Sequence, residues 1–156
     1  MPKLKDFEML QDALDNDKNV SVSTLTHSQI KQDKNNILQS MQFKSAELKS
    51  LHARLNGYRY IENDADICIG SYVRWISLKN PDNLVLTNGA HVCGICTTND
   101  TNDPDGANTA SAQIKCKTTH GNRCRFFVLN TDENVLFQKL TDQERIILDA
   151  FKFIDS

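Results

Sequence analysis

The longest periodic stretch of the chain reads THSQIKQDKNNILQSMQFKSAELKSLHARLNG, residues 26–57, and it decides how the N-terminal part folds. Thr26 can cap a helix, and Gln29 follows three residues later, as in a capping box. Gly57 stands where a residue with left-handed backbone would end that helix. We therefore predict one helix over 27–56, about 45 Å long at a rise of about 1.5 Å per residue.

This predicted helix carries a narrow apolar seam. Apolar residues fill six of its eight a and d heptad positions, and Lys34 and Lys44 take the other two. The apolar members are Ile30, Ile37, Met41, Leu48, Leu51 and Leu55. A seam of this width is typical of a helix that packs against partner helices in a coiled coil. The alternative is a hairpin within the chain, in which a short amphipathic helix over 2–16 covers the seam.

Strand periodicity replaces helical periodicity in the second part of the chain. Residues 67–78 read ICIGSYVRWISL, which is rich in β-branched and aromatic residues. Turn residues such as Asn88-Gly89 separate this segment from further alternating segments. The further strands are expected at 84–87, 90–97, 112–118, 122–130 and 135–140.

A second capping box begins a helix near the end of the sequence. Thr141 and Glu144 have the required spacing, and an apolar face follows over 142–154. We predict an α+β fold with two parts: a helical arm over 1–62, and a small β-rich domain over 63–156. In the second part, an antiparallel β-barrel or roll would be closed by the C-terminal helix.

Composition narrows the classes of protein to consider. Lys and Arg number 18 against 20 Asp and Glu, so the net charge of −2 indicates neither a nucleic acid nor a membrane surface as partner of the whole chain. No apolar run reaches the roughly 18 residues of a membrane span, and membrane insertion is not expected. Five cysteines, an odd number, favour reduced thiols over a disulfide framework. We expect a soluble intracellular protein.

Four of the cysteines are candidate zinc ligands, because zinc takes four soft ligands in a tetrahedral array. They are Cys93, Cys96, Cys116 and Cys124. The first two have the Cys-x2-Cys spacing, whereas seven residues separate the other two. The alternative is that Cys116 and Cys124 face one another on the apolar side of a hairpin, where cysteine acts as a small hydrophobe. No other cofactor is expected.

The same predicted hairpin carries four basic residues. With a three-residue turn at 119–121, Lys115 lies opposite Arg125 and Lys117 lies opposite Arg123. Like charges placed opposite each other destabilise a sheet, so an anionic partner could compensate them. The alternative is a solvated edge that is kept basic to prevent strand-to-strand aggregation.

Catalytic patterns are sparse. The sequence contains no glycine-rich phosphate loop, no nucleophile elbow and no paired-histidine metal helix. The polar loop over 98–111 has only half of the ligand pattern of a calcium loop, and we interpret it as a surface loop. We do not expect an enzyme.

Three short segments carry a resemblance to known proteins. Residues 70–76 (GSYVRWI), 88–90 (NGA) and 137–141 (FQKLT) resemble small proteins of large double-stranded DNA viruses. This resemblance covers the C-terminal half only, and it implies a virion component or a small β-barrel module. It implies no catalytic residue.

The leading functional prediction is a structural or assembly protein. It would be a minor virion or capsid-associated component that binds other protein subunits, in a homo- or hetero-oligomer, through the helical arm and the β-domain. One alternative is a nucleic-acid or polyanion-binding module that uses the hairpin 115–125. The other alternative is a zinc-stabilised adaptor.

Overall fold

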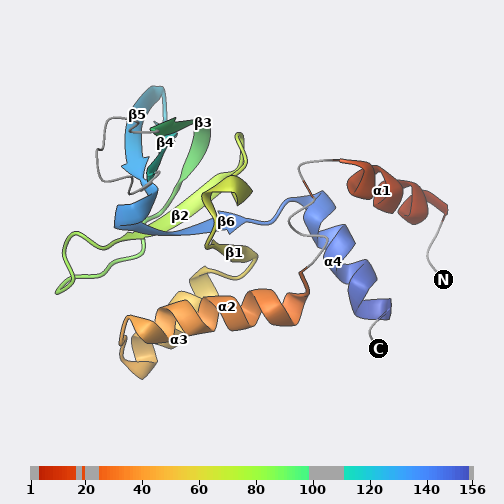
Figure 1. Ribbon diagram of the computed structural model, residues 1–156, viewed down its shortest axis with the longest axis horizontal. Coiled ribbons are helices and arrows are strands. Elements are labelled where there is room, and N and C mark those ends of the chain that lie inside the picture. Colours follow the sequence, from red (N-terminus) through yellow and green to blue (C-terminus); the bar gives the residue numbers. More distant parts are fainter. Residues whose placement is uncertain (1–3, 17–18, 20–24, 99–110, 155–156) are drawn as a thin grey trace, which may run out of the picture. The chain divides into compact units, whose positions relative to one another are not determined.

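The structure is a computed structural model, and it describes residues 4–16, 19, 25–98 and 111–154 (Figure 1). The chain divides into two units, each of which is considered by itself. A helical unit comprises residues 1–60 and 139–156, and a strand unit comprises residues 61–138. The predicted division near residue 62 is close to the first boundary. The C-terminal helix, however, belongs with the other helices and not with the strands.

The helical unit contains four α-helices among the described residues. They are α1 (Leu4–Asp15), α2 (His27–Ser40), α3 (Ser45–Arg54) and α4 (Asp142–Ile154). Both predicted helix starts are confirmed, but only the second is a reciprocal capping box, because the side chain of Gln29 donates to Asp33 instead. The Gln29 amide donates to the Thr26 hydroxyl oxygen over 3.1 Å at the start of α2. At the start of α4, Thr141 and Glu144 bond each other reciprocally, over 3.0 and 3.1 Å.

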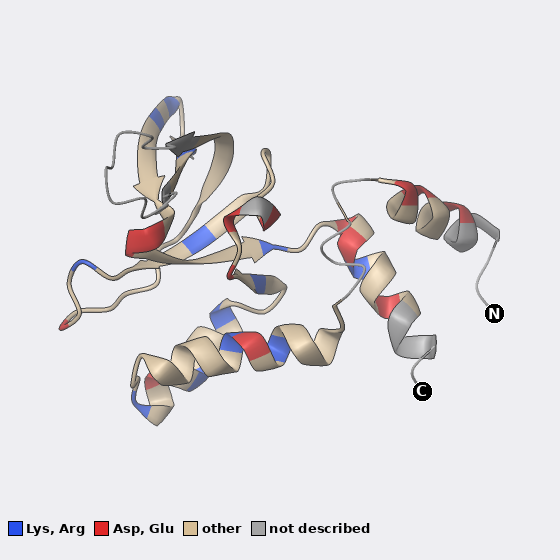
Figure 2. Ribbon diagram, viewed as in Figure 1, with Lys and Arg blue, Asp and Glu red and all other residues tan. Residues whose placement is uncertain are grey.

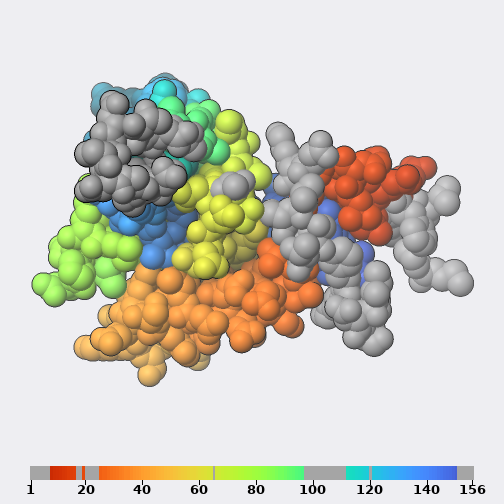
Figure 3. Space-filling view, viewed as in Figure 1, coloured from red at the N-terminus to blue at the C-terminus, as the bar shows by residue number. Residues whose placement is uncertain are grey.

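The prediction of one helix over 27–56 is wrong. Helix α2 ends at Ser40, Gln42 takes a left-handed backbone with φ of 61°, and α3 begins at Ser45. The hydroxyl of Ser40 bonds the carbonyl oxygen of Ile37 over 2.6 Å, which offers the last turn a local alternative to further helix. The chain therefore reverses, and α2 and α3 contact each other; atoms of this region form the orange surface in Figure 3.

Because of this reversal, residues of the predicted seam are buried or half-buried by contacts within the chain. Ile30, Leu51 and Leu55 are buried, whereas Ile37, Met41 and Leu48 are half-buried. Polar contacts also join the two helices: the ammonium of Lys34 donates to the carbonyl oxygen of Leu55 over 3.0 Å, and His52 Nε2 lies 3.2 Å from Asn35 Oδ1. A continuous apolar seam along one long helix, on which the predicted coiled coil depended, is therefore not present over residues 27–56.

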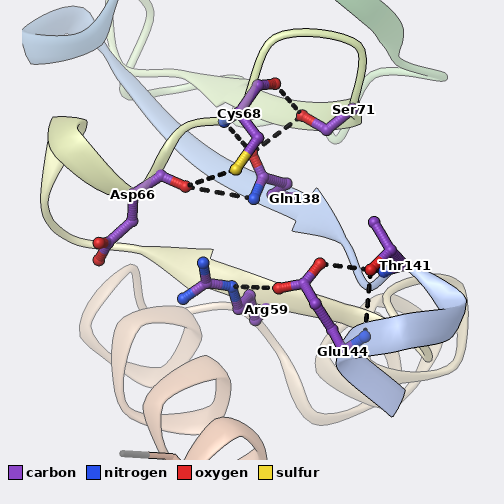
Figure 4. Close-up of polar contacts among 7 residues, drawn as sticks. All are labelled: Arg59, Asp66, Cys68, Ser71, Gln138, Thr141 and Glu144. Atoms are coloured by element: carbon purple, nitrogen blue, oxygen red, sulfur yellow. Dashed lines mark hydrogen bonds and ion pairs between the residues drawn. The ribbon is translucent and has the colours of Figure 1, made fainter. Parts of the chain in front are cut away.

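Helix α4 is held by apolar and charged contacts. Ala13 of α1 packs with Ile147 and Leu148 of α4 in a buried cluster, which Ile30 joins. Arg59, on strand β1 (Tyr58–Ile61), and Glu144 are both buried, with Nε and Oε2 3.8 Å apart (Figure 4). Helix α1 thus packs on α4, and not chiefly along α2 as the hairpin alternative supposed.

The strands form an antiparallel sheet in the order β1-β6-β2-β3-β4-β5. The bounds of the remaining strands are β2 Tyr72–Ser77, β3 Ala90–Thr98, β4 Ser111–His120, β5 Arg123–Asn130 and β6 Asn134–Lys139. The α+β prediction is confirmed, but closure into a barrel is not shown, because β1 and β5 stand at the two ends of the order. The predicted strand at 84–87 is reduced to one bridge between Ile76 and Leu86. Residues 99–110 of the predicted loop lie outside the described residues.

One face of the strand unit forms its hydrophobic core, and a buried amide is set into it. Val73, Val92 and Ile114 are almost fully buried there. The side chain of Gln138 is also buried, and its Oε1 accepts from the Cys68 amide and the Ser71 hydroxyl, both over 2.9 Å (Figure 4). Gln138 thereby ties the segment before β2 to β6.

Replacement of this amide by an apolar side chain tests its structural role. We expect Gln138→Leu to lower the free energy of unfolding by about 1–3 kcal/mol, because the Cys68 amide and the Ser71 hydroxyl would lose their hydrogen bonds to the buried Gln138 side chain. Urea denaturation of the full chain measures the change. Gln39→Leu, at an exposed position, should stay within about 0.5 kcal/mol of the parent. Equal effects of the two substitutions would contradict this role.

The break between α2 and α3 predicts opposite signs for two glycine substitutions. Gln42→Gly should stabilise the chain by about 0.5–1 kcal/mol, because glycine adopts the left-handed backbone without steric cost. Gln32→Gly, within α2, should destabilise it by about 1 kcal/mol. Thermal or urea unfolding distinguishes the two cases. A loss of stability at both positions would instead indicate a continuous helix over 27–56.

Candidate polyanion-binding face

Strands β4 and β5 form a hairpin whose register differs from the predicted one. The chain turns at Gly121 and Asn122, and Gly121 has φ of 60°, as at the first central position of a type II′ turn. Lys115 therefore pairs with Val128, and Lys117 pairs with Phe126. The predicted pairings with Arg125 and Arg123 are wrong. Because His120 continues β4 instead of belonging to the turn, each partner on β5 moves three residues along.

The corrected register divides the four basic residues between two faces. Lys115 and Lys117 alternate with the buried Cys116, so they lie on the outer face of the hairpin, away from the core. Arg123 and Arg125 are exposed near the turn, on the other set of alternating positions. The outer face therefore has no facing pairs of like charges at these positions. Each of the two lysines lies opposite an apolar side chain.

Two of these apolar side chains are unusually exposed. Phe126 is 66% exposed and Val128 is 54% exposed, and both lie on β5, at the end of the strand order. The ammonium of Lys117 lies 5.9 Å from the centre of the Phe126 ring, within the range of a cation–π contact. A basic edge that served only against aggregation would not explain an exposed aromatic ring.

The Lys117–Phe126 pair continues into a row across four strands. Tyr72 on β2 pairs with His91 on β3, which pairs with Lys117 on β4, which pairs with Phe126 on β5. The rings of Tyr72 and His91 meet edge to face, with centroids 5.0 Å apart. At about 4.8 Å per strand, the row spans roughly 14 Å. Three rings and one ammonium group thus lie along a single line.

Charge is concentrated on the same hairpin. Residues 111–130 contain Lys115, Lys117, Arg123 and Arg125 and no acidic residue, although the chain has a net charge of −2. Figure 2 shows basic residues near the turn of the hairpin. A local excess of positive charge of this kind attracts polyanions, whatever the net charge of the chain.

The four candidate zinc ligands do not converge. Cys116 points into the core and is fully buried, whereas Cys124 lies on the opposite face of the hairpin and is exposed. Cys93 and Cys96 on β3 are also exposed. Within 4–16, 19, 25–98 and 111–154, no three His, Cys, Asp or Glu side chains are grouped to hold a metal ion. In this structure Cys116 and Cys124 therefore do not share a face of the hairpin, and a zinc site stays a prediction.

Burial raises the pKa of the Cys116 thiol to about 11, and the neighbouring Cys93 adds to the shift. The folded thiol therefore keeps its proton where an unfolded one, with an ordinary pKa of 9.0, would lose it. We expect the free energy of unfolding to fall as the pH rises from about 9 towards 11. In Cys116→Ala this fall should be smaller over the same pH range.

Alkylation tests the same difference between thiols. At pH 8, iodoacetamide should modify Cys124 on the folded chain, whereas Cys116 should react only after unfolding, because it is buried and protonated. Peptide mass spectrometry measures the two rates on one sample. Equal rates at the two positions would show that Cys116 is not held in the core.

Comparison with known proteins finds no match: neither a protein-family model, nor a curated protein, nor a solved structure is significantly similar to this chain. No helix among the described residues is long and apolar enough to cross a membrane. A function for the candidate face is therefore inferred from its geometry alone.

Sequence reasoning identified the basic residues of this face but missed Tyr72, His91 and Phe126. The error lay in the turn. Gly121-Asn122 is itself a two-residue hairpin signal, and with that turn the pairing of Lys117 with Phe126 follows directly. The longer pairing through His91 to Tyr72 needs the irregularity between Val92 and Gly94, which the sequence does not reveal.

Proposed function

We propose that the chain is a binding protein whose outer face on β2, β3, β4 and β5 binds single-stranded nucleic acid. The observation that carries this proposal is the row of Tyr72, His91, Lys117 and Phe126 across four strands. Proteins that bind single strands combine aromatic side chains, on which bases stack, with basic groups that follow the phosphates. The row contains both kinds of group on one face.

Each group has a distinct task in this proposal. Phe126 offers an exposed ring for stacking of a base, while Lys115 and Lys117 contact phosphates on the same face. Arg123 and Arg125, near the turn, extend the positive field beyond the stacking surface. Val128, beside Lys115, adds apolar area that a base or a sugar can cover.

A single strand suits this face better than a duplex does. In a duplex the bases are already stacked, and the contacts available to a flat sheet are mostly phosphates, which exposed apolar side chains do not favour. An unpaired base can instead cover Phe126 and remove its ring from water. The exposed Phe126 and Val128 therefore favour the single-stranded ligand.

Assembly with other protein subunits is the second candidate function. It is favoured by the same exposed apolar side chains on an end strand, since such strands can pair with a strand of another chain. The original argument for assembly, a continuous helical seam, does not survive the break after Ser40. A virion or capsid-associated role stays a prediction from the resemblance.

Binding of a labelled 20-nucleotide poly(dT) by the full chain, followed by fluorescence anisotropy, tests the primary proposal. We expect Phe126→Ala to weaken binding by about 1–3 kcal/mol, or roughly 5- to 150-fold, through loss of stacking. Phe126→Tyr should retain most of the affinity. Lys115→Glu/Lys117→Glu should weaken binding and lower the slope of log K against log salt by about 1.4, for two phosphate contacts.

Lys44→Glu/Lys49→Glu, at two exposed positions outside the hairpin, changes the net charge by the same amount as the hairpin double variant and should leave binding within about twofold of the parent. Equal losses for the two double variants would reduce the effect to net charge. If no single strand binds and light scattering shows an oligomer that Phe126→Ala dissociates, the face serves assembly instead.

A further inference from the structure

The helical unit contains an open pocket with a volume of about 820 Å³, which is lined by residues of this unit alone. Its polar and charged lining comes from α2, α3, α4 and the segment before β1. The charged and imidazole groups in it are His27, Lys31, Lys34, His52, Arg145 and Asp149. Ile30 and Leu140 add buried apolar surface to the lining. This volume is in the usual range for a small-molecule site.

Helical spacing explains why these groups face one pocket. On α2, His27, Lys31 and Lys34 are four and three residues apart, which places them on one face of the helix. On α4, Arg145 and Asp149 are four residues apart and share a face in the same way. Two helices far apart in sequence therefore present charged faces to the same space.

The pocket has an excess of cations. Asp149 is the single acidic residue among the described residues that line it, and its carboxylate is contacted by His27 Nε2 over 2.8 Å. Lys31, Lys34 and Arg145 face the pocket as well, and among the described residues neither Lys31 nor Arg145 forms an ion pair. Among the described residues of the unit, the positive charge is therefore left largely without ion pairs.

Burial and the positive charge of the pocket lower the pKa values of two groups in its lining. Burial lowers the pKa of the Lys34 ammonium, and the charge of Lys31 lowers it further. Burial also lowers the pKa of His52, with additional contributions from Lys34 and Lys31. These groups lie near enough to repel one another, and an anion placed among them would relieve that repulsion.

The position of Arg145 depends on Gly57. A β-carbon at residue 57 would lie 2.8 Å from Nη2 of Arg145, so a side chain there would displace the guanidinium. Gly57 also has φ of 84°, and its carbonyl oxygen accepts from the Leu140 amide over 2.8 Å. The glycine thus leaves room for Arg145 beside the pocket while its backbone joins the start of α4 to the rest of the unit.

We propose that this pocket binds a small molecule that carries a phosphate or diphosphate group. The anionic group lies among Lys31, Lys34 and Arg145, and the remainder of the molecule packs towards Ile30 and Leu140. An ammonium has three donors, and Lys34 uses one of them on the carbonyl oxygen of Leu55. The guanidinium of Arg145 supplies a planar pair of donors that suits phosphate oxygens.

Inorganic pyrophosphate is the probe, titrated into the full chain by calorimetry at low ionic strength, with inorganic phosphate and citrate in parallel. We expect pyrophosphate to bind with a dissociation constant below about 1 mM and more tightly than citrate of similar charge. Lys31→Met, an exposed position that should not affect folding, should weaken binding at least tenfold. Arg145→Gln should do the same.

Lys34→Met separates ligand binding from folding. The carbonyl oxygen of Leu55 also accepts from the Tyr58 amide over 3.0 Å, so removal of the ammonium does not leave it without a donor. This variant should keep the thermal unfolding midpoint of the parent within a few degrees and lose at least tenfold in pyrophosphate affinity. If it unfolds the chain, Lys31→Met still decides the question.

Lys49→Met, at an exposed lysine outside the pocket, is the control and should bind as the parent does. The proposal is overturned if pyrophosphate does not bind at millimolar concentration, if Lys49→Met costs as much as Lys31→Met, or if citrate binds and pyrophosphate does not. Loss of pyrophosphate binding in Lys117→Met but not in Lys31→Met would also overturn it, by placing the anion on the strand face.

Discussion

The register of the β4–β5 hairpin is the constraint on which the candidate nucleic-acid face depends. Side chains alternate along a strand with a period of two, so the turn decides which residues of β5 accompany Lys115 and Lys117. With the turn at Gly121 and Asn122, those partners are Val128 and Phe126. The same register sends Phe127 inward, where its ring lies 5.5 Å from that of Trp75. One turn thus positions both a core contact and an exposed ring.

Local signals in the sequence were sufficient for some elements and insufficient for others. The capping signals at Thr26 and Thr141 involve residues that are three apart, and helices begin at both places in the structure. The end of α2 is different, because four of the five heptad positions after Ser40 continue the apolar pattern. Burial of Leu51 and Leu55 within the chain competes with that pattern, and such tertiary packing leaves no mark on helical periodicity.

Long-range partners explain the remaining differences. Gln138 reads as an ordinary polar position of a strand, yet its amide is satisfied by Cys68 and Ser71, about 70 residues earlier. The pocket was missed for a similar reason: Lys34 looked like an interruption of an apolar seam, and Arg145 lies more than 100 residues away from it. The basic residues of the hairpin were found because they are close in sequence. Their stacking partners required the correct register.

Net charge describes neither candidate site, because charge acts over short distances in salt. At physiological ionic strength the screening length is about 8 Å, so a ligand responds to the groups around it and not to the sum over the chain. The excess of acidic residues lies outside the hairpin and outside most of the pocket lining. Lys34 shows the consequence most clearly. The side chain of Lys34 is buried, and the carbonyl oxygen of Leu55 to which it donates also accepts from the Tyr58 amide. A charge in such a partly desolvated wall would act more strongly on an anion in the pocket than the same charge in water.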